Sequence, residues 1–342
     1  MVFNVLNIIS GFLEVGSVVY GMKHFGIYGA LIGALCYQLG NLVPSPFTIS
    51  KRLCNVFMVI AAMGLVVGLH TEEAVLFSVP FLAAVLQNIR SSYKVNINKN
   101  DRSADDAKNV RFGKEKKRFV RIIGFVFGFL LNSLTGLLCC VIVGFLVNKS
   151  EQSSKNKMQR MKFNVFDYVL LFHEIHYFVY CYCMIAIAYE SFGSVMACVM
   201  FLMSWLLYVF SPRAYTQIEK LFHGNYIKTF VLGHLVLITI LIVIAGHTEL
   251  PVKLVFWMLT GIGGTTEYCI ERIEKQKNMY EKDAHTAAEN LGHVGGVALS
   301  ILLYMYTNNL NNALVAAILC AAAAIVLMII GNKKGVREYE NK

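Results

Sequence analysis

The sequence predicts an all-α integral membrane protein in which about twelve transmembrane helices form two similar six-helix halves. Three observations support this fold class. Hydrophobic residues make up 56% of the 342 residues and charged residues only 15%, with a mean hydropathy of +0.56, which is too apolar for a water-soluble domain. Apolar stretches of about 20 residues, the length that crosses a bilayer, recur between short polar breaks. Finally, the second half of the chain repeats a residue pattern of the first.

The apolar stretches define the expected helices in chain order. The first begins at Val2 and lacks the basic segment of a cleavable signal peptide, so we expect it to stay in the membrane. Residues 118–147 are long for one span and short for two. Because basic loops flank them on both sides, we expect two crossings with a turn at Asn132 and Ser133. The expected spans are 3–22, 26–45, 52–69, 73–92, 112–131, 133–148, 164–187, 192–210, 226–246, 250–272, 287–306 and 310–331.

The basic residues set the expected orientation. Of the 31 lysines and arginines, all but Lys23 and Lys253 fall in or near alternate loops and the C-terminal tail. Cytoplasmic loops of membrane proteins collect positive charge, so we expect both termini in the cytoplasm and the protein in the plasma (inner) membrane. The net charge of +10 follows from this bias and favours contact with anionic lipid over a nucleic-acid partner.

The two halves share a pattern in the same order. At an offset of 160 residues, Glu14 aligns with Glu174 and Tyr20 with Tyr180. Further matches pair Phe3-Asn4-Val5 with Phe163-Asn164-Val165, Phe25-Gly26 with Phe192-Gly193, Ser45-Pro46 with Ser211-Pro212, and His70-Thr71-Glu72 with His247-Thr248-Glu249. Two halves that begin on the same side form a parallel repeat. We therefore expect an N-terminal six-helix bundle (1–148), a basic cytoplasmic linker (149–162), a C-terminal six-helix bundle (163–332) and a cytoplasmic tail (333–342).

This architecture resembles the major facilitator superfamily (MFS) of secondary transporters over the whole chain. The shared features are twelve helices, a six-plus-six duplication, a basic central loop and cytoplasmic termini. The loop between the second and third helices reads Pro-Ser-Pro-Phe-Thr-Ile-Ser-Lys-Arg, whereas the family often carries a Gly-x-x-x-Asp-Arg-x-Gly-Arg motif there. The resemblance implies a solute site between the halves, lined by the first helix of each half.

Ionisable side chains in apolar spans are costly, which makes them the first candidate functional residues. Glu14 in the first span and Glu174 in the seventh are expected to take up and release protons, because a carboxyl in apolar surroundings is protonated more easily. The alternative is that each carboxyl only holds a neighbouring helix in place. Asn7 shares a helix face with Glu14, and Asp167 shares one with Glu174, while Tyr180 completes the repeat pattern.

The seventh span also contains His173 and His176, three residues apart on one face. Their spacing differs from the HExxH motif of metalloproteases. A proton relay or solute contact is the favoured interpretation, and we expect no bound metal or other cofactor. A soft-metal site that adds Cys181 and Cys183 and a purely structural role are the alternatives.

The eleventh span places His285, Glu289 and His293 at intervals of four on one face. Glu289 and His293 are expected to form a titrating pair, because histidine changes charge near physiological pH. The alternative is an interfacial cluster that caps the start of this helix.

Three further charged residues complete the candidate site. Arg90, at the end of the fourth span, aligns in the His-Thr-Glu register with Glu267 in the tenth. These opposite charges are expected to form an inward-side gate or to bind the two ends of a zwitterion, although anchoring at the membrane surface explains Arg90 equally well. Arg121 is the deepest residue of a basic run and a candidate anion contact.

Together these features predict a secondary active transporter that is proton-coupled, as a symporter or antiporter, and moves a small polar, charged or zwitterionic solute. We expect no enzymatic activity. The alternatives are an intramembrane metal-dependent or lipid-modifying enzyme that uses His173, Glu174 and His176, a transporter of metals or metal chelates, and a receptor that transports nothing. The sequence leaves the solute, the transport direction and the oligomeric state open.

Overall fold

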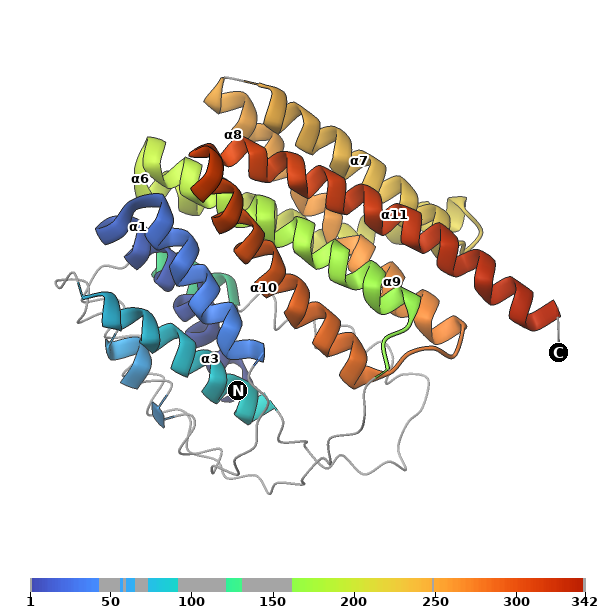
Figure 1. The fold of residues 1–342 in the computed structure, drawn as a ribbon, viewed down its shortest axis with the longest axis horizontal. Coiled ribbons are helices and arrows are strands. Elements are labelled where there is room, and N and C mark those ends of the chain that lie inside the picture. The colour runs from blue at the N-terminus through green and yellow to red at the C-terminus, as the bar shows by residue number, and fades with distance from the viewer. Residues whose placement is uncertain are drawn as a thin grey trace. The chain divides into compact units, whose positions relative to one another are not determined.

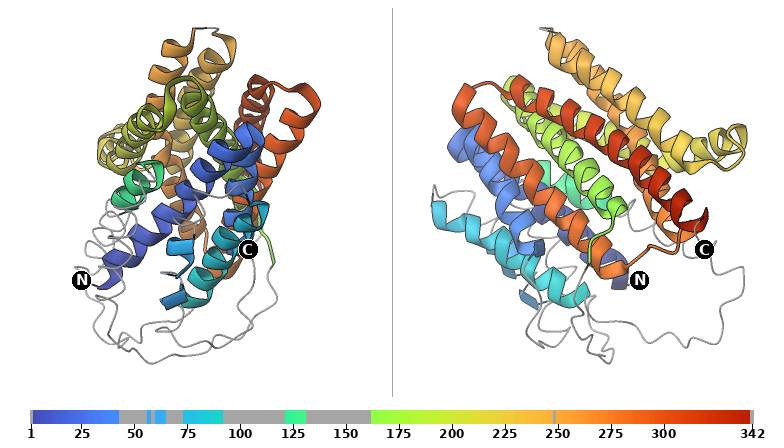
Figure 2. Two further views of the ribbon diagram at one scale, coloured as in Figure 1. Left: turned by 90° about the vertical axis from the view of Figure 1, so that its left-hand side faces the viewer. Right: turned by 45° about the vertical axis from the view of Figure 1, so that its right-hand side comes forward.

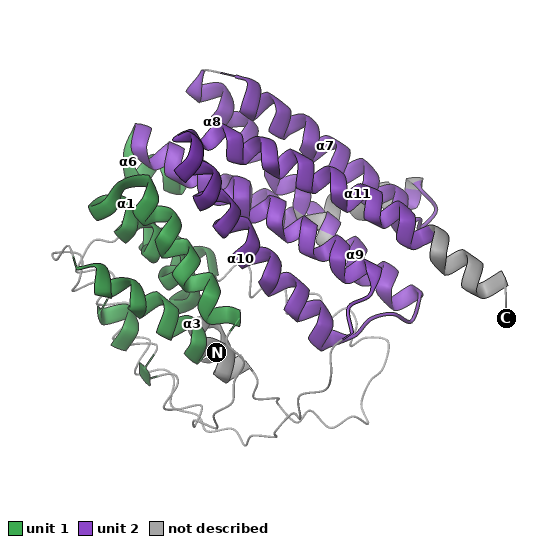
Figure 3. Ribbon diagram, viewed as in Figure 1, with its two compact units in different colours: residues 1–159, 192–198 green, residues 160–191, 199–342 purple. Residues whose placement is uncertain are grey.

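The computed structural model describes residues 2–42, 56–57, 60–64, 73–91, 121–130, 162–247 and 249–340 (Figure 1). The regular secondary structure of these residues is entirely helical, which confirms the predicted all-α class. The chain divides into two compact units, Met1–Gln159 with Phe192–Cys198, and Arg160–Ser191 with Val199–Lys342 (Figure 3). The expected sixth span, 133–148, lies outside the described residues, so twelve spans and six helices per half remain predictions.

The first unit contains α1 (Val2–Leu42), the short 3-10 helix η1 (Ala74–Phe77), α3 (Ser78–Ser91) and a helical segment at 121–130. Helix α1 packs against η1 and α3. Their contact is apolar, and the small alanines of α3 let the two helices approach closely. The buried residues of this core are Ile9, Phe12, Leu13, Tyr20, Tyr37, Ala62, Ala83 and Ala84.

The second unit contains α6 (Val165–Leu221), α7 (Tyr226–Gly246), α8 (Leu250–Leu259), the 3-10 helix η2 (Thr260–Gly263), α9 (Gly264–Gln276), α10 (Lys282–Thr307) and α11 (Leu310–Glu340). Helix α7 packs against α8, α9 and α11, and the ribbon views show α7 and α11 running side by side (Figure 2). Helix α11 continues to Glu340, so most of the expected tail is helical.

Both long helices are interrupted at a single glycine. Gly26 in α1 has φ 63° and ψ −153°, and Gly193 in α6 has φ 78° and ψ 179°. Only glycine adopts this backbone conformation without strain. The two residues are the glycines of the matched Phe-Gly pairs, and each lies at the start of an expected span, 26–45 or 192–210. The same rare conformation at matched positions supports the internal duplication.

Four described helical stretches are long and apolar enough to cross a membrane: Ile8–Leu42, Val165–Ser211, Tyr226–Gly246 and Leu310–Asn332. The first and second of these contain the glycine breaks, so each covers two expected spans. Shorter apolar helices occupy Ala74–Leu86, Arg121–Leu130 and Leu250–Gly263. These helices support the prediction of an integral membrane protein.

Candidate functional site

Glu14 forms an ion pair inside the first unit. Its Oε2 accepts a hydrogen bond from the guanidinium of Arg121, at the start of the helical segment 121–130. The guanidinium carbon also lies 5.6 Å from the centroid of the Phe125 ring, which favours a cation over its face. Glu14 and Arg121 were candidates for separate reasons, and the structure brings them together.

Glu174, the residue matched to Glu14, also faces a base on another helix. Nε2 of His293 in α10 lies within hydrogen-bond distance, 3.2 Å, of its Oε2. The His293 ring stacks on Phe178 with the ring centroids 4.0 Å apart, which fixes its orientation. Glu174 is only 6% exposed, so the carboxyl depends on this partner rather than on water. The expected pairing of His293 with Glu289 stays a prediction.

Glycines four residues apart bring the helices of each pair close together. In the first unit, Gly124 and Gly128 lie against α1, and a Cβ added at Gly124 would lie 2.0 Å from the carbonyl oxygen of Ile8. In the second unit, a Cβ at Gly292 or Gly296 would lie within 2.8 Å of a backbone oxygen of α6. This is the small-residue packing that lets membrane helices touch through their backbones. Each unit therefore contains an acid on its first helix, a base on another helix and a glycine-lined contact between them.

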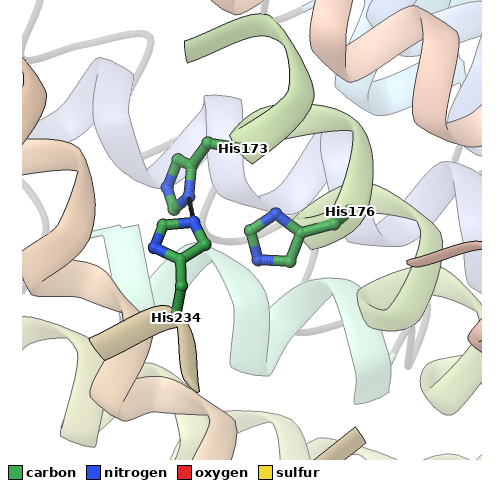
Figure 4. A group of neighbouring side chains, drawn as sticks. All are labelled: His173, His176 and His234. Atoms are coloured by element: carbon green, nitrogen blue, oxygen red, sulfur yellow. Dashed lines mark hydrogen bonds between the residues drawn. The ribbon is translucent and has the colours of Figure 1, made fainter. Parts of the chain in front are cut away.

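A group of three imidazoles is buried in the second unit. His173 and His176 come from α6, and His234 comes from α7 (Figure 4). One ring nitrogen from each lies within 4.8 Å of the others, and Nδ1 of His173 is 3.3 Å from Nε2 of His234. Tyr180 is buried next to them, with its ring centroid 5.9 Å from that of His176. These nitrogens are donors that could hold a transition metal.

Asp167 belongs to a second cluster, at the start of α6. Its carboxyl, that of Glu274 in α9 and the His285 ring bring one donor atom each within 4.8 Å of one another. Nδ1 of His285 lies 2.7 Å from Oε2 of Glu274, a charge-assisted hydrogen bond that already occupies both atoms. The second Asp167 oxygen, Oδ2, accepts the backbone N–H of Asn164 and so caps the helix. Sharing of protons among the three groups is the chemistry that fits this geometry.

The pKa of His285 reflects two opposing effects at the start of α10. Burial lowers it, while the hydrogen bond to Glu274 and the negative charges of Glu274, Glu289 and Glu271 raise it. The carboxylates prevail, and the pKa lies above its ordinary value of 6.5. His285 is therefore more readily protonated in the folded protein than in the unfolded chain.

The structure describes the side chains of only some of the remaining candidate residues. Asn7, Arg90 and Glu267 lie in helices, but their side chains fall outside the described part of the structure, so the expected gate between Arg90 and Glu267 stays a prediction. Glu289 lies in α10 and is half-buried. Cys181 is buried but is not among the donor groups found within 4.8 Å of one another in the described residues.

Two site residues were missed in the sequence. His234 is a single histidine in an otherwise apolar helix, and only the packing of α7 against the rest of the unit shows what it contacts. Glu274 sits among charged residues at the end of α9 and looks like an ordinary surface residue in the sequence, although it is fully buried. The Gly-x-x-x-Gly spacing of Gly124 with Gly128 and of Gly292 with Gly296 was a readable signal for the two helix contacts.

Comparison with known proteins gives a match in fold. No protein-family model and no curated protein sequence matches this chain. Among solved structures it is similar to a bacterial homologue of the iron transporter ferroportin in an inward-facing state, with a TM-score of 0.63 and 11% identity over 96% of this chain and 98% of that one. A bacterial metal transporter gives a TM-score of 0.61 at 11% identity, covering 97% and 98% of the two chains. The nucleoside transporter NupG gives 0.59 at 13% identity, covering 97% and 100%.

The same fold occurs in the fucose:proton symporter FucP of E. coli, which is described as an MFS transporter. It gives a TM-score of 0.54 at 10% identity over 96% of this chain and 97% of that one. At such low identity these similarities concern the fold, and they extend over nearly the entire chain. The protein therefore has the fold of the major facilitator superfamily transporters.

Proposed function

We propose that the protein is a secondary transporter that moves a small polar or charged solute across a membrane by alternating access. The observation that carries this proposal is the repeated acid–base pair. Glu14 with Arg121 in one unit and Glu174 with His293 in the other place ionisable groups inside apolar helices, where their cost demands a function. The presence of both acids and bases in the apolar helices suits a charged or zwitterionic solute.

The similar structures support the same activity. Those compared above are all titled as transporters, which agrees with the expectation that this chain is not an enzyme. The imidazoles of His173, His176 and His234 favour a second candidate function, an intramembrane metal enzyme, because such an enzyme would use them as metal ligands. A transporter explains more, because an enzyme centred on α6 leaves the matched pair in the first unit without a role.

We further propose that protons drive transport through the first unit. Glu14 faces Arg121, and the hydroxyl of Tyr37 lies close to both, hydrogen-bonded to Ser10. Proton uptake by Glu14 would remove the charge that holds Arg121 and so release the helix contact. Proton binding and opening of the pair would then be linked, which is what a coupled transporter requires.

Reconstituted vesicles test this proposal. The purified protein is placed in vesicles with a pH-sensitive dye inside, and gradients of sugars, nucleosides, amino acids, organic anions and divalent metals are imposed in turn. We expect solute uptake accompanied by proton movement for one class, with proton movement lost in Glu14→Gln and kept in Glu73→Gln, which changes an exposed acid of the same unit. Proton movement that survives Glu14→Gln would refute the coupling, and the absence of uptake for every class would refute transport.

A further inference from the structure

The three imidazoles of His173, His176 and His234 are buried together, with the hydroxyl of Thr266 3.5 Å from Nδ1 of His173. Their exposed fractions are 4%, 0% and 0%, and the surrounding helices are apolar. Polar groups buried this deeply normally have hydrogen-bond partners. Here Nε2 of His176 is buried and has none. A histidine nitrogen with an unused lone pair, next to two other imidazoles, is a position prepared for a ligand.

The other ring nitrogens orient two of the imidazoles. Nδ1 of His176 lies 3.4 Å from the carbonyl oxygen of Phe172, and Nδ1 of His234 lies 3.2 Å from that of Phe230. A carbonyl accepts, so each Nδ1 carries the proton and each Nε2 presents a lone pair to the cluster. Metal-binding histidines are held in this way, by a backbone carbonyl or a carboxylate on the far nitrogen.

His173 is oriented differently, by His234 on one side and Glu174 on the other. Its Nδ1 faces His234, while its Nε2 faces the Glu174 carboxylate, 4.0 Å from Oε1. Because Nε2 of His234 accepts in this contact, Nδ1 of His173 carries the proton, and metal binding at Nδ1 requires that proton to move to Nε2, beside the Glu174 carboxylate. After that proton shift, each of the three rings can present one unprotonated nitrogen to the cluster.

The spacing of these nitrogens fits a small ion. Ligand bonds of about 2.0–2.1 Å at tetrahedral angles place two imidazole nitrogens roughly 3.3 Å apart. The His173 and His234 nitrogens are 3.3 Å apart, and all three lie within 4.8 Å.

We propose that His173, His176 and His234 bind a divalent transition metal ion and that this ion is a transported solute. The proposal rests on the transporter function inferred above and names its solute class. Imidazole ligands suit Zn²⁺, Fe²⁺, Co²⁺, Ni²⁺ and Cu²⁺, whereas Mg²⁺ and Ca²⁺ require oxygen donors. Two of the similar structures are titled as a metal transporter and as a homologue of an iron transporter.

The number of ligands argues against a purely structural ion. Structural zinc sites are closed by four protein ligands, whereas three ligands leave a fourth position open to water or another ligand. The described donor group contains three imidazoles and no cysteine thiolate, which avoids the strongest zinc ligands.

Equilibrium binding tests the site separately from transport. Purified, chelator-treated protein is dialysed against Zn²⁺ or Co²⁺, and bound metal is measured by mass spectrometry, with Mg²⁺ as the comparison ion. We expect a single Zn²⁺ or Co²⁺ per chain and no Mg²⁺. Affinity should fall at least about 100-fold in His176→Gln and His234→Gln, because each loses a ligand. It should be unchanged in His247→Gln, an exposed histidine just after the helix that carries His234.

Folding of the variants is checked by thermal unfolding without metal. His176→Gln removes Nε2, which has no partner, and also the contact of Nδ1 with the carbonyl oxygen of Phe172, so its unfolding temperature without metal separates a loss of stability from the loss of the metal. Wild-type protein that binds no Zn²⁺ or Co²⁺, or variants that bind as well as wild type, would overturn the proposal. Metal binding without flux of any solute in vesicles would support the metal site and refute transport. Flux of another solute without metal binding would support transport and refute the metal site.

Discussion

Replacing Gly292 by Ala tests whether the glycine contact holds the acid–base pair of the second unit together. A Cβ at Gly292 would lie 2.4 Å from the Glu174 Cβ and 2.8 Å from the carbonyl oxygen of Leu171, against an ordinary contact of 3.4 Å or more. Helices α6 and α10 must therefore separate by about 1 Å. The hydrogen bond between Glu174 and His293 is 3.2 Å long, so it would stretch beyond about 4 Å and break.

The expected loss of stability combines three effects. Overpacking costs about 1–3 kcal/mol. A broken polar contact between membrane helices costs roughly 0.6–1.7 kcal/mol. Alanine recovers about 1 kcal/mol because it favours the helix more than glycine does. The net destabilisation is on the order of 1–3 kcal/mol.

Gly295→Ala is the matched control on the same helix. Its Cβ would meet only the flexible end of Ile175, at 3.3 and 3.5 Å, so we expect unchanged or slightly higher stability. Thermal unfolding of both variants in detergent measures the difference, and vesicle uptake measures its effect on transport. Equal unfolding temperatures for Gly292→Ala and Gly295→Ala would refute the close contact.

Three further predictions address other parts of the structure. Gly193→Ala should lower the free energy of unfolding by about 1–3 kcal/mol, because alanine is strained in this backbone conformation even though its Cβ would contact no other atom. Gly246→Ala, whose Cβ would also contact nothing, should leave the free energy of unfolding nearly unchanged. Denaturant unfolding of both variants measures the difference. A double-mutant cycle with Glu14→Gln and Arg121→Leu should give a coupling of about 0.5–3 kcal/mol in unfolding, and strict additivity would argue against the ion pair. Because the pKa of His285 is raised, its protonation stabilises the folded protein below pH 6.5, and this stabilisation is lost as the pH rises through the folded-state pKa. The difference in unfolding temperature between wild type and His285→Gln should therefore shrink with rising pH. A difference that stays constant would contradict this.

The fold class could be predicted because it depends on bulk properties of the chain. Apolar stretches of spanning length predict membrane helices, and the bounds of the expected spans place a division near each of the two glycine breaks. Glycine signals such a break because the required φ excludes other residues. These signals are local, so one sequence is enough to read them.

The candidate site was only partly predictable because its contacts join distant residues. Glu14 and Glu174 stood out as charges in apolar helices, but their bases are 107 and 119 residues away in sequence. The metal-binding hypothesis considered the neighbouring Cys181 and Cys183, whereas the structure adds His234 from another helix. Sequence spacing shows which residues share a helix face, and only the packing of helices shows which faces meet.

Gradient-driven uptake in reconstituted vesicles tests the central claim most directly. Vesicles that contain the protein, and no ATP, are given an inward gradient of each solute class, including Zn²⁺ and Co²⁺, and uptake is compared with that of Glu174→Gln vesicles and empty vesicles. The account predicts saturable uptake of one class by wild type and its loss in Glu174→Gln. Uptake no greater than in empty vesicles for every class, by folded protein, would contradict it.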